Sequence, residues 1–151
     1  MLRDDPAYAK KAARVSALAR DVGEVVSGEK DRLAALLPKA DAGEPIAYHA
    51  PCSLQHGQKK KGLVEAVLRD AGFTLTTVPD AHLCCGSAGT YSILQPELSQ
   101  QLLTNKVRAL ESGSPSEICT SNIGCLLHIG GGASKPVSHW IELLDRRLSA
   151  S

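Results

Sequence analysis

Apolar residues recur at helical spacing in the first part of the chain. The repeated positions are Val15, Leu18, Ala19 and Val22 between Pro6 and Gly23, and Leu33, Leu36 and Leu37 before Pro38. This spacing places apolar side chains on one face of a helix. We therefore predict a helical lead-in over residues 1–44.

From Pro45 onward, short apolar strands alternate with helices. The expected strands are 46–49, 73–78, 117–120 and a last one from Pro136; the expected helices follow Pro51, begin at Pro96, cover 125–128 and start at Trp140. Alternation of this kind predicts crossover connections and a parallel sheet. The predicted fold class is α/β: a small parallel sheet of about four strands flanked by helices, with residues 45–151 as one domain.

Composition argues against two classes of function, nucleic-acid binding and a membrane-spanning role. The chain has 151 residues, a net charge of +1, one Trp, one Phe and three Tyr. So small a net charge and so few rings argue against a nucleic-acid partner. No apolar run reaches the length of about 18 residues that a membrane-spanning helix needs, so we expect no transmembrane segment and a cytoplasmic protein.

Cysteines supply the strongest chemical signal. Cys52 follows the first predicted strand, Cys84 and Cys85 follow the second, and Cys125 follows the third. Loops after the carboxyl ends of parallel strands gather at one edge of the sheet, so these four thiols are expected to converge. Gly86 supplies the permissive backbone that a turn with two adjacent cysteines needs. Thiolates suit an iron–sulfur cluster or zinc, so the four are candidate cofactor and metal ligands.

Alternatives remain for each of these residues. Buried cysteines often only fill space, and Cys119, inside a predicted strand, is expected to be such a core residue. Asn122 is expected to cap a helix. The histidines near the cysteine loops could bind zinc or hydrogen-bond a cluster sulfur; they are His49, His56, His82 and His128. A vicinal disulfide between Cys84 and Cys85 is a weaker possibility, since its ring is strained.

The cysteine motifs resemble those of a known family. The resemblance covers about residues 45–144 and rests on Tyr48-His49-Ala50-Pro51-Cys52, Cys84-Cys85-Gly86-Ser87-Ala88-Gly89-Thr90-Tyr91, Lys106 and Asn122-Ile123-Gly124-Cys125. These motifs are similar to the cysteine-rich CCG domain of heterodisulfide reductase and related iron–sulfur oxidoreductases. Within that family, the sequence resembles the carboxyl-terminal domain of the glycolate oxidase iron–sulfur subunit.

This resemblance implies a fragment of a longer electron-transfer subunit. The implied partners are flavin-containing glycolate oxidase subunits, which oxidise glycolate to glyoxylate, and a missing amino-terminal ferredoxin-like region. The domain alone would then relay electrons without catalysis, in a complex that could lie at the periphery of the inner membrane.

One departure from the family pattern leaves the cofactor open. Asn122 stands where the heterodisulfide reductase pattern has a further cysteine, so four thiols remain instead of five. A 4Fe–4S cluster is the leading expectation. A structural or regulatory zinc site is the alternative, and a fragment that holds no metal is also compatible with the sequence.

Overall fold

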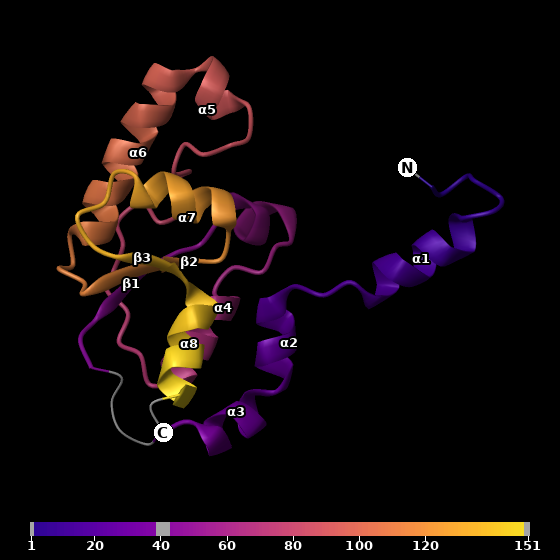
Figure 1. Cartoon of the computed structure of the whole chain (residues 1–151), viewed down its shortest axis with the longest axis horizontal. Coiled ribbons are helices and arrows are strands. Elements are labelled where there is room, and N and C mark those ends of the chain that lie inside the picture. The colour runs from indigo at the N-terminus through magenta and orange to yellow at the C-terminus, as the bar shows by residue number, and fades with distance from the viewer. Residues whose placement is uncertain (1, 39–42, 150–151) are drawn as a thin grey trace.

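A three-stranded parallel sheet forms the centre of the protein (Figure 1). The computed structural model describes residues 2–38 and 43–149. The strands lie in the order β1 (Ile46–His49), β2 (Glu117–Thr120) and β3 (Val137–His139). Ile46 pairs with Glu117 in the register, and Thr120 pairs with both His49 and His139. The middle strand β2 is therefore paired on both sides.

Helices connect and cover these strands. They are α1 (Ala9–Leu18), α2 (Val22–Gly28), α3 (Lys30–Leu36), a π-helical turn η1 (Ser53–Gly57), α4 (Leu63–Asp70), α5 (Tyr91–Leu94), α6 (Pro96–Glu111), α7 (Ile123–Gly130) and α8 (Trp140–Ser149). Pro96 opens α6, where its fixed φ suits the first turn and no backbone donor is lost. No described helix combines the length and the apolar character that crossing a membrane requires.

The sheet separates two hydrophobic clusters. Alternate residues of β1 point to opposite faces, so Tyr48 joins one cluster and Ala47 joins the other. The first cluster packs α4 and α8 against the sheet around Trp140, and the second packs α6 and α7 against it around Ile118. Figure 1 shows these two helix pairs on opposite sides of the strands. The result is a three-layer α/β/α arrangement.

The predicted α/β class is confirmed, but one predicted strand is reduced to a single bridge. Segment 73–78 pairs with the sheet only where Leu75 meets Ile46, beside β1 on the side away from β2. The Ile46 N–H donates to the Thr74 carbonyl, and the Thr76 N–H donates to the Ile46 carbonyl, both at 2.9 Å. A pattern of alternating residues predicts an extended conformation. How many of its residues pair with the sheet depends on the position of the neighbouring strand.

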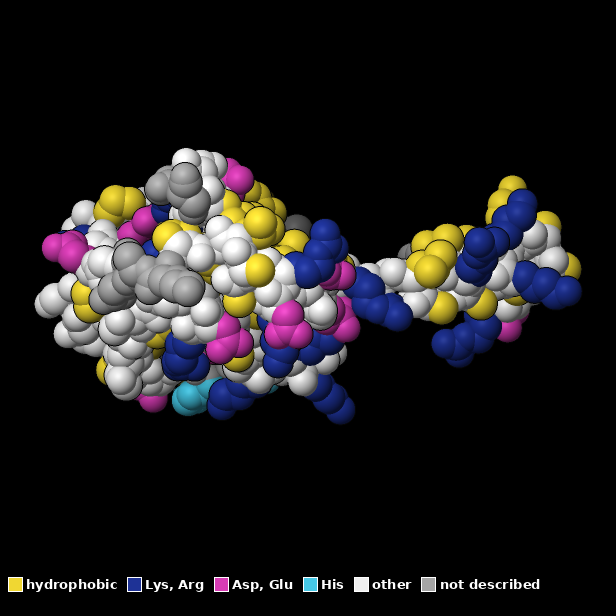
Figure 2. Space-filling model, turned by 90° about the horizontal axis from the view of Figure 1, so that it is seen from below, with side chains coloured by type: hydrophobic (Ala, Val, Ile, Leu, Met, Phe, Trp, Pro, Cys, Tyr) yellow, Lys and Arg dark blue, Asp and Glu magenta, His cyan; other side chains and the backbone are white. Residues whose placement is uncertain are grey.

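The lead-in divides into a packed part and an arm. Val26, Leu33 and Leu37 of the α2–α3 region pack against the first cluster, and Lys60 forms an ion pair with Glu24. Helix α1, by contrast, has no buried residue and extends away from the body (Figure 1). Figure 2 shows Lys and Arg side chains interspersed with hydrophobic ones along this arm. The predicted boundary between residues 44 and 45 closely follows residues 39–42, which lie outside the described part, and it stays a prediction.

The helix predicted through Val22 ends earlier than expected. Helix α1 stops at Leu18, and α2 starts after Asp21. The Asp21 carboxylate accepts from the Gly23 N–H, while Glu24 accepts from the Asp21 N–H, which makes a capping box. The first N–H groups of a helix have no hydrogen-bond partner within it, and a capping box satisfies some of them. The box therefore favours the beginning of a new helix at this position.

Replacing a buried leucine of the second cluster should test this core. Leu110 of α6 is fully buried, whereas Leu98 on the same helix is 46% exposed. We expect Leu110→Ala to lower the free energy of unfolding by about 2–5 kcal/mol, because it removes apolar contacts and leaves a cavity. Leu98→Ala should change it by less than about 1 kcal/mol. Urea unfolding followed by circular dichroism measures both, and equal losses would contradict the assignment of the core.

Candidate metal centre

The site lies at the carboxyl edge of the sheet, between β1 and β2. After β1 the chain continues toward α4 on one face of the sheet, and after β2 it continues into α7 on the other face. Segments that leave adjacent parallel strands toward opposite faces open a crevice at the ends of those strands. Cys52 lies three residues after β1, and Cys125 lies in the first turn of α7. Cys52 therefore reaches the crevice from the end of β1, and Cys125 reaches it from the end of β2.

A cavity of about 230 Å³ occupies this crevice. Its lining includes Cys52, Cys84 and Cys125, from three separate connections, together with Pro51, Ser53, Ser87, Ala88, Gly89 and Asn122. Cys85 is buried next to this lining: its sulfur, the Cys125 sulfur and a ring nitrogen of His49 lie within 4.8 Å of one another. The structure thus brings together all four predicted cysteines, and it adds His49 to them.

Hydrogen bonds organise the sulfurs. The Gly86 N–H donates to Cys84 Sγ at 3.3 Å, and the Ser87 hydroxyl donates to Cys125 Sγ at 3.7 Å. Cys85 Sγ lies 3.3 Å from the same hydroxyl. Donors aimed at sulfur stabilise its negative charge and tune the potential of a bound centre. In the sequence, only its place in the Cys84–Tyr91 motif pointed to Ser87.

The thiols differ in their acidity. Hydrogen bonds from Cys125, His49 and Ser87 hold the pKa of Cys85 far below its usual range, although burial opposes this effect. The bond to Cys85 and burial raise the pKa of Cys125, which keeps the proton that the pair shares. Burial also raises the pKa of Cys52, and the neighbouring thiols of Cys84 and Cys85 raise it further. One thiolate therefore forms readily here, while more would need a cation to offset their charge.

Two polar side chains fix the loops that carry the cysteines. Gln55 Nε2 donates to the Ala50 carbonyl at 2.6 Å and lies 3.5 Å from the Ala81 carbonyl, so it joins the connection after β1 to the one before Cys84. Asn122 caps α7, as predicted, and its Oδ1 accepts from the Cys125 N–H at 3.2 Å. The cap sets the position of the first turn that holds Cys125.

The structure separates the remaining candidates. Cys119 lies in β2, is fully buried in the first cluster, and has a pKa raised by burial, so the prediction of a core residue is confirmed. His56 and His82 are exposed and are not in the His49–Cys85–Cys125 group. His128 instead supports the turn: its Nε2 lies 3.3 Å from the Ser99 hydroxyl, which donates to the Gly86 carbonyl at 2.9 Å. All five cysteines are free thiols.

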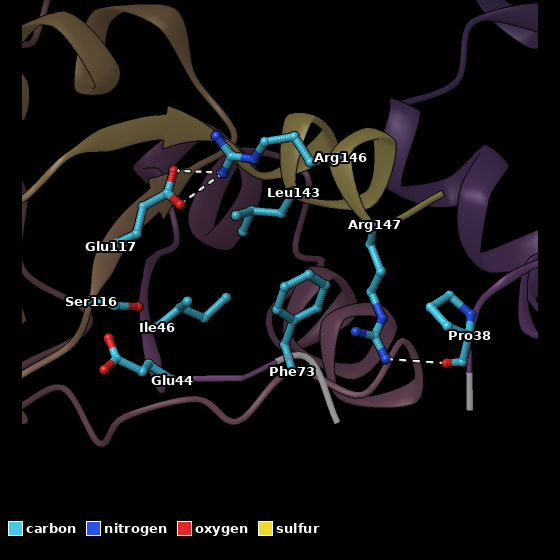
Figure 3. Close-up of a pocket in the computed structure, with 9 residues that line it drawn as sticks. All are labelled: Pro38, Glu44, Ile46, Phe73, Ser116, Glu117, Leu143, Arg146 and Arg147. Carbon is cyan, nitrogen blue, oxygen red and sulfur yellow. Dashed lines mark hydrogen bonds and ion pairs between the residues drawn. The ribbon is translucent and has the colours of Figure 1, made fainter. Parts of the chain in front are cut away.

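A larger cavity, of about 320 Å³, lies at the opposite end of the sheet (Figure 3). Ile46 and Glu117, which begin β1 and β2, belong to its lining. Figure 3 shows Glu117 bound by Arg146 through both carboxylate oxygens and Arg147 directed to the Pro38 carbonyl. The Arg146–Glu117 pair joins α8 to the start of β2. None of the described residues that line this cavity is a cysteine or a histidine. The cysteine cavity is therefore the candidate metal site.

Known proteins resemble this chain in the same region. The family described as the CCG cysteine-rich domain matches residues 46–130. The glycolate oxidase iron–sulfur subunit of Escherichia coli K12 is 50% identical over 148 residues, which are 98% of this chain and 35% of that subunit. Lactate utilization protein A of Bacillus licheniformis is 29% identical over 160 residues, covering 97% of this chain and 63% of that protein. The chain spans less than two thirds of the length of these relatives.

The glycine of the cysteine turn offers a test of this geometry. Gly86 has φ +96°, and a Cβ there would lie 2.5 Å from the Ser99 carbonyl oxygen. Gly89 has φ +52° with open space around it. We expect Gly86→Ala to lower the free energy of unfolding by at least about 2 kcal/mol, since backbone strain and a backbone clash add. Gly89→Ala should cost about 1 kcal/mol. Thermal and urea unfolding measure both; a smaller loss for Gly86→Ala would contradict the turn.

Proposed function

Since this chain belongs to the CCG cysteine-rich domain family, we propose that it is an electron-transfer domain whose Cys52, Cys84, Cys85 and Cys125 hold an iron–sulfur centre. The observation that carries the proposal is the convergence of three connections on one cavity at the carboxyl edge of the sheet. Cys52 and Cys84 are only half-buried, so packing in the hydrophobic core does not account for all four sulfurs at this cavity. Ligation of one metal ion or cluster would explain why the four sulfurs converge.

The donor set suits such a centre. Thiolate sulfur is the preferred ligand of iron–sulfur clusters, and a bound cluster supplies one-electron chemistry. The chain's residues would hold the thiolates in place through the Gly86 N–H and the Ser87 hydroxyl. Burial of Cys85 and Cys125 would limit access of water to that side of the centre. A rigid, partly dry site keeps the potential well defined.

We further propose that the domain works within a glycolate-oxidising complex. The 50% identity to a glycolate oxidase iron–sulfur subunit supports this assignment. In such a complex, a flavin-containing subunit would oxidise glycolate to glyoxylate and pass electrons on, one at a time, through this domain. Sequence outside this chain, such as a ferredoxin-like region, would carry further clusters. On this proposal the domain itself does not bind glycolate.

Anaerobic reconstitution tests the ligand set. We expect protein treated with iron and sulfide to show a cluster signal in electron paramagnetic resonance, either as prepared or after reduction. Cys85→Ser should abolish it, because the variant loses a central thiolate. Cys119→Ala is the matched control and should keep the signal, since Cys119 lies in the hydrophobic core. The same loss in both variants, or in neither, would contradict the proposed set.

A zinc site is the second candidate, and His49 favours it. A ring nitrogen of His49 lies with the Cys85 and Cys125 sulfurs in a group that one ion could span. Zinc sites commonly combine cysteine and histidine ligands in a tetrahedron. The role would then be structural or regulatory, without electron transfer.

Metal content separates the two candidates. Protein purified without oxygen should contain iron and acid-labile sulfide if the electron-transfer proposal holds, and one zinc per chain without iron if the alternative holds. His49→Ala adds a second readout: it should remove most of the zinc from a zinc site, whereas an iron–sulfur centre held by four cysteines should keep its iron. Zinc alone, lost on His49→Ala, would refute the iron assignment.

A further inference from the structure

Lys106 is a buried cation beside the candidate centre. It lies in the middle of α6, and only 3% of its surface is exposed. Its Nζ donates to the Asp80 carbonyl at 2.9 Å and lies 3.5 Å from the Ala81 carbonyl. Both carbonyls belong to the loop that leads into Cys84 and Cys85. The side chain therefore attaches the cysteine loop to α6.

The charged ammonium group of Lys106 is buried without a close carboxylate partner among the described residues. Among the residues that the structure describes, no ion pair within 4.0 Å includes Lys106. Burial lowers its pKa, while the negative charge of Cys85, Asp80, Cys52 and Cys84 acts in the opposite direction. A buried ammonium group is costly unless nearby groups offset its charge. Cys85, the sulfur whose pKa is held low, is the first of these groups to offset the charge.

We propose that Lys106 is a positioning and charge-compensating residue of the metal centre, which holds the cysteine loop by its carbonyls and offsets the negative charge of the sulfurs. This inference rests on the proposed function. When the domain accepts one electron from the flavoprotein partner, its net charge becomes more negative by one. Lys106 stabilises that reduced form more than the oxidised form and so raises the reduction potential.

A merely structural lysine would behave differently. Its loss would loosen the loop without a specific effect on the reduction potential of the centre. Lys106→Met keeps the length of the side chain but removes the charge, whereas Lys106→Arg keeps the charge and the donors. Arg108→Met removes a positive charge from an exposed position on the same helix and is the matched control.

The first experiment measures the reduction potential of the reconstituted protein by a redox titration followed spectroscopically. We expect Lys106→Met to disfavour reduction by about tenfold, which is about 59 mV for a one-electron couple. Arg108→Met should leave the potential unchanged, because solvent and salt screen an exposed charge. Lys106→Arg should restore most of the shift. An unchanged potential in Lys106→Met would overturn the inference.

The second experiment uses metal-free, reduced protein and measures amide hydrogen exchange in the loop from Asp80 to Cys85. We expect Lys106→Met to exchange there at least about tenfold faster than the wild-type protein, because the loop loses the contacts of its Asp80 and Ala81 carbonyls with Lys106 Nζ. Lys106→Arg should slow this exchange again, and equal exchange in Lys106→Met and Arg108→Met would overturn the inference. Failure of the wild-type protein to bind iron would instead count against the proposed function, and hydrogen exchange would still decide whether Lys106 holds the loop.

Discussion

Parallel pairing of β1 with β2 is the constraint on which the rest of the site depends. The register from Ile46–Glu117 to His49–Thr120 brings the ends of both strands level. The Thr120 hydroxyl donates to the His49 carbonyl at 2.9 Å, which adds a side-chain bond to this end of the ladder. Because the chain leaves the two strands toward opposite faces, a crevice forms there, and Cys52 and Cys125 come to its rim.

The second hydrophobic cluster holds the cysteine pair against this crevice. Cys85 packs with Leu103 and Val107 of α6, and the Ser99 hydroxyl on the same helix fixes the Gly86 carbonyl. Lys106 binds the start of the same loop from this helix. Helix α6 thus holds the loop through apolar side chains and through the polar side chains of Ser99 and Lys106. The position of the thiols is therefore coupled to the stability of the core, as expected for a site built on rigid elements.

Local signals in the sequence were enough for some features and not for others. Strands β1 and β2 begin and end where predicted, because their apolar runs are bounded by proline, serine and asparagine. Segment 73–78 was overestimated, since ladder formation depends on a partner that the sequence does not show. The Asp21–Glu24 capping box could have revealed the break after α1. The burial of Lys106 depends on tertiary packing, which no local pattern of a charged residue predicts.

Asn122 explains how four cysteines can be arranged without a fifth at this position. Its side-chain oxygen already accepts from the Cys125 N–H, so one of its acceptor sites is used as a helix cap even though the residue lines the cavity. A cysteine there would be a poor cap, because sulfur is a weak acceptor. Asn122 therefore fixes the position of Cys125 and does not supply an additional thiol ligand. His49, held beside Cys85 and Cys125, is the group nearest to supplying a further donor on this side of the site.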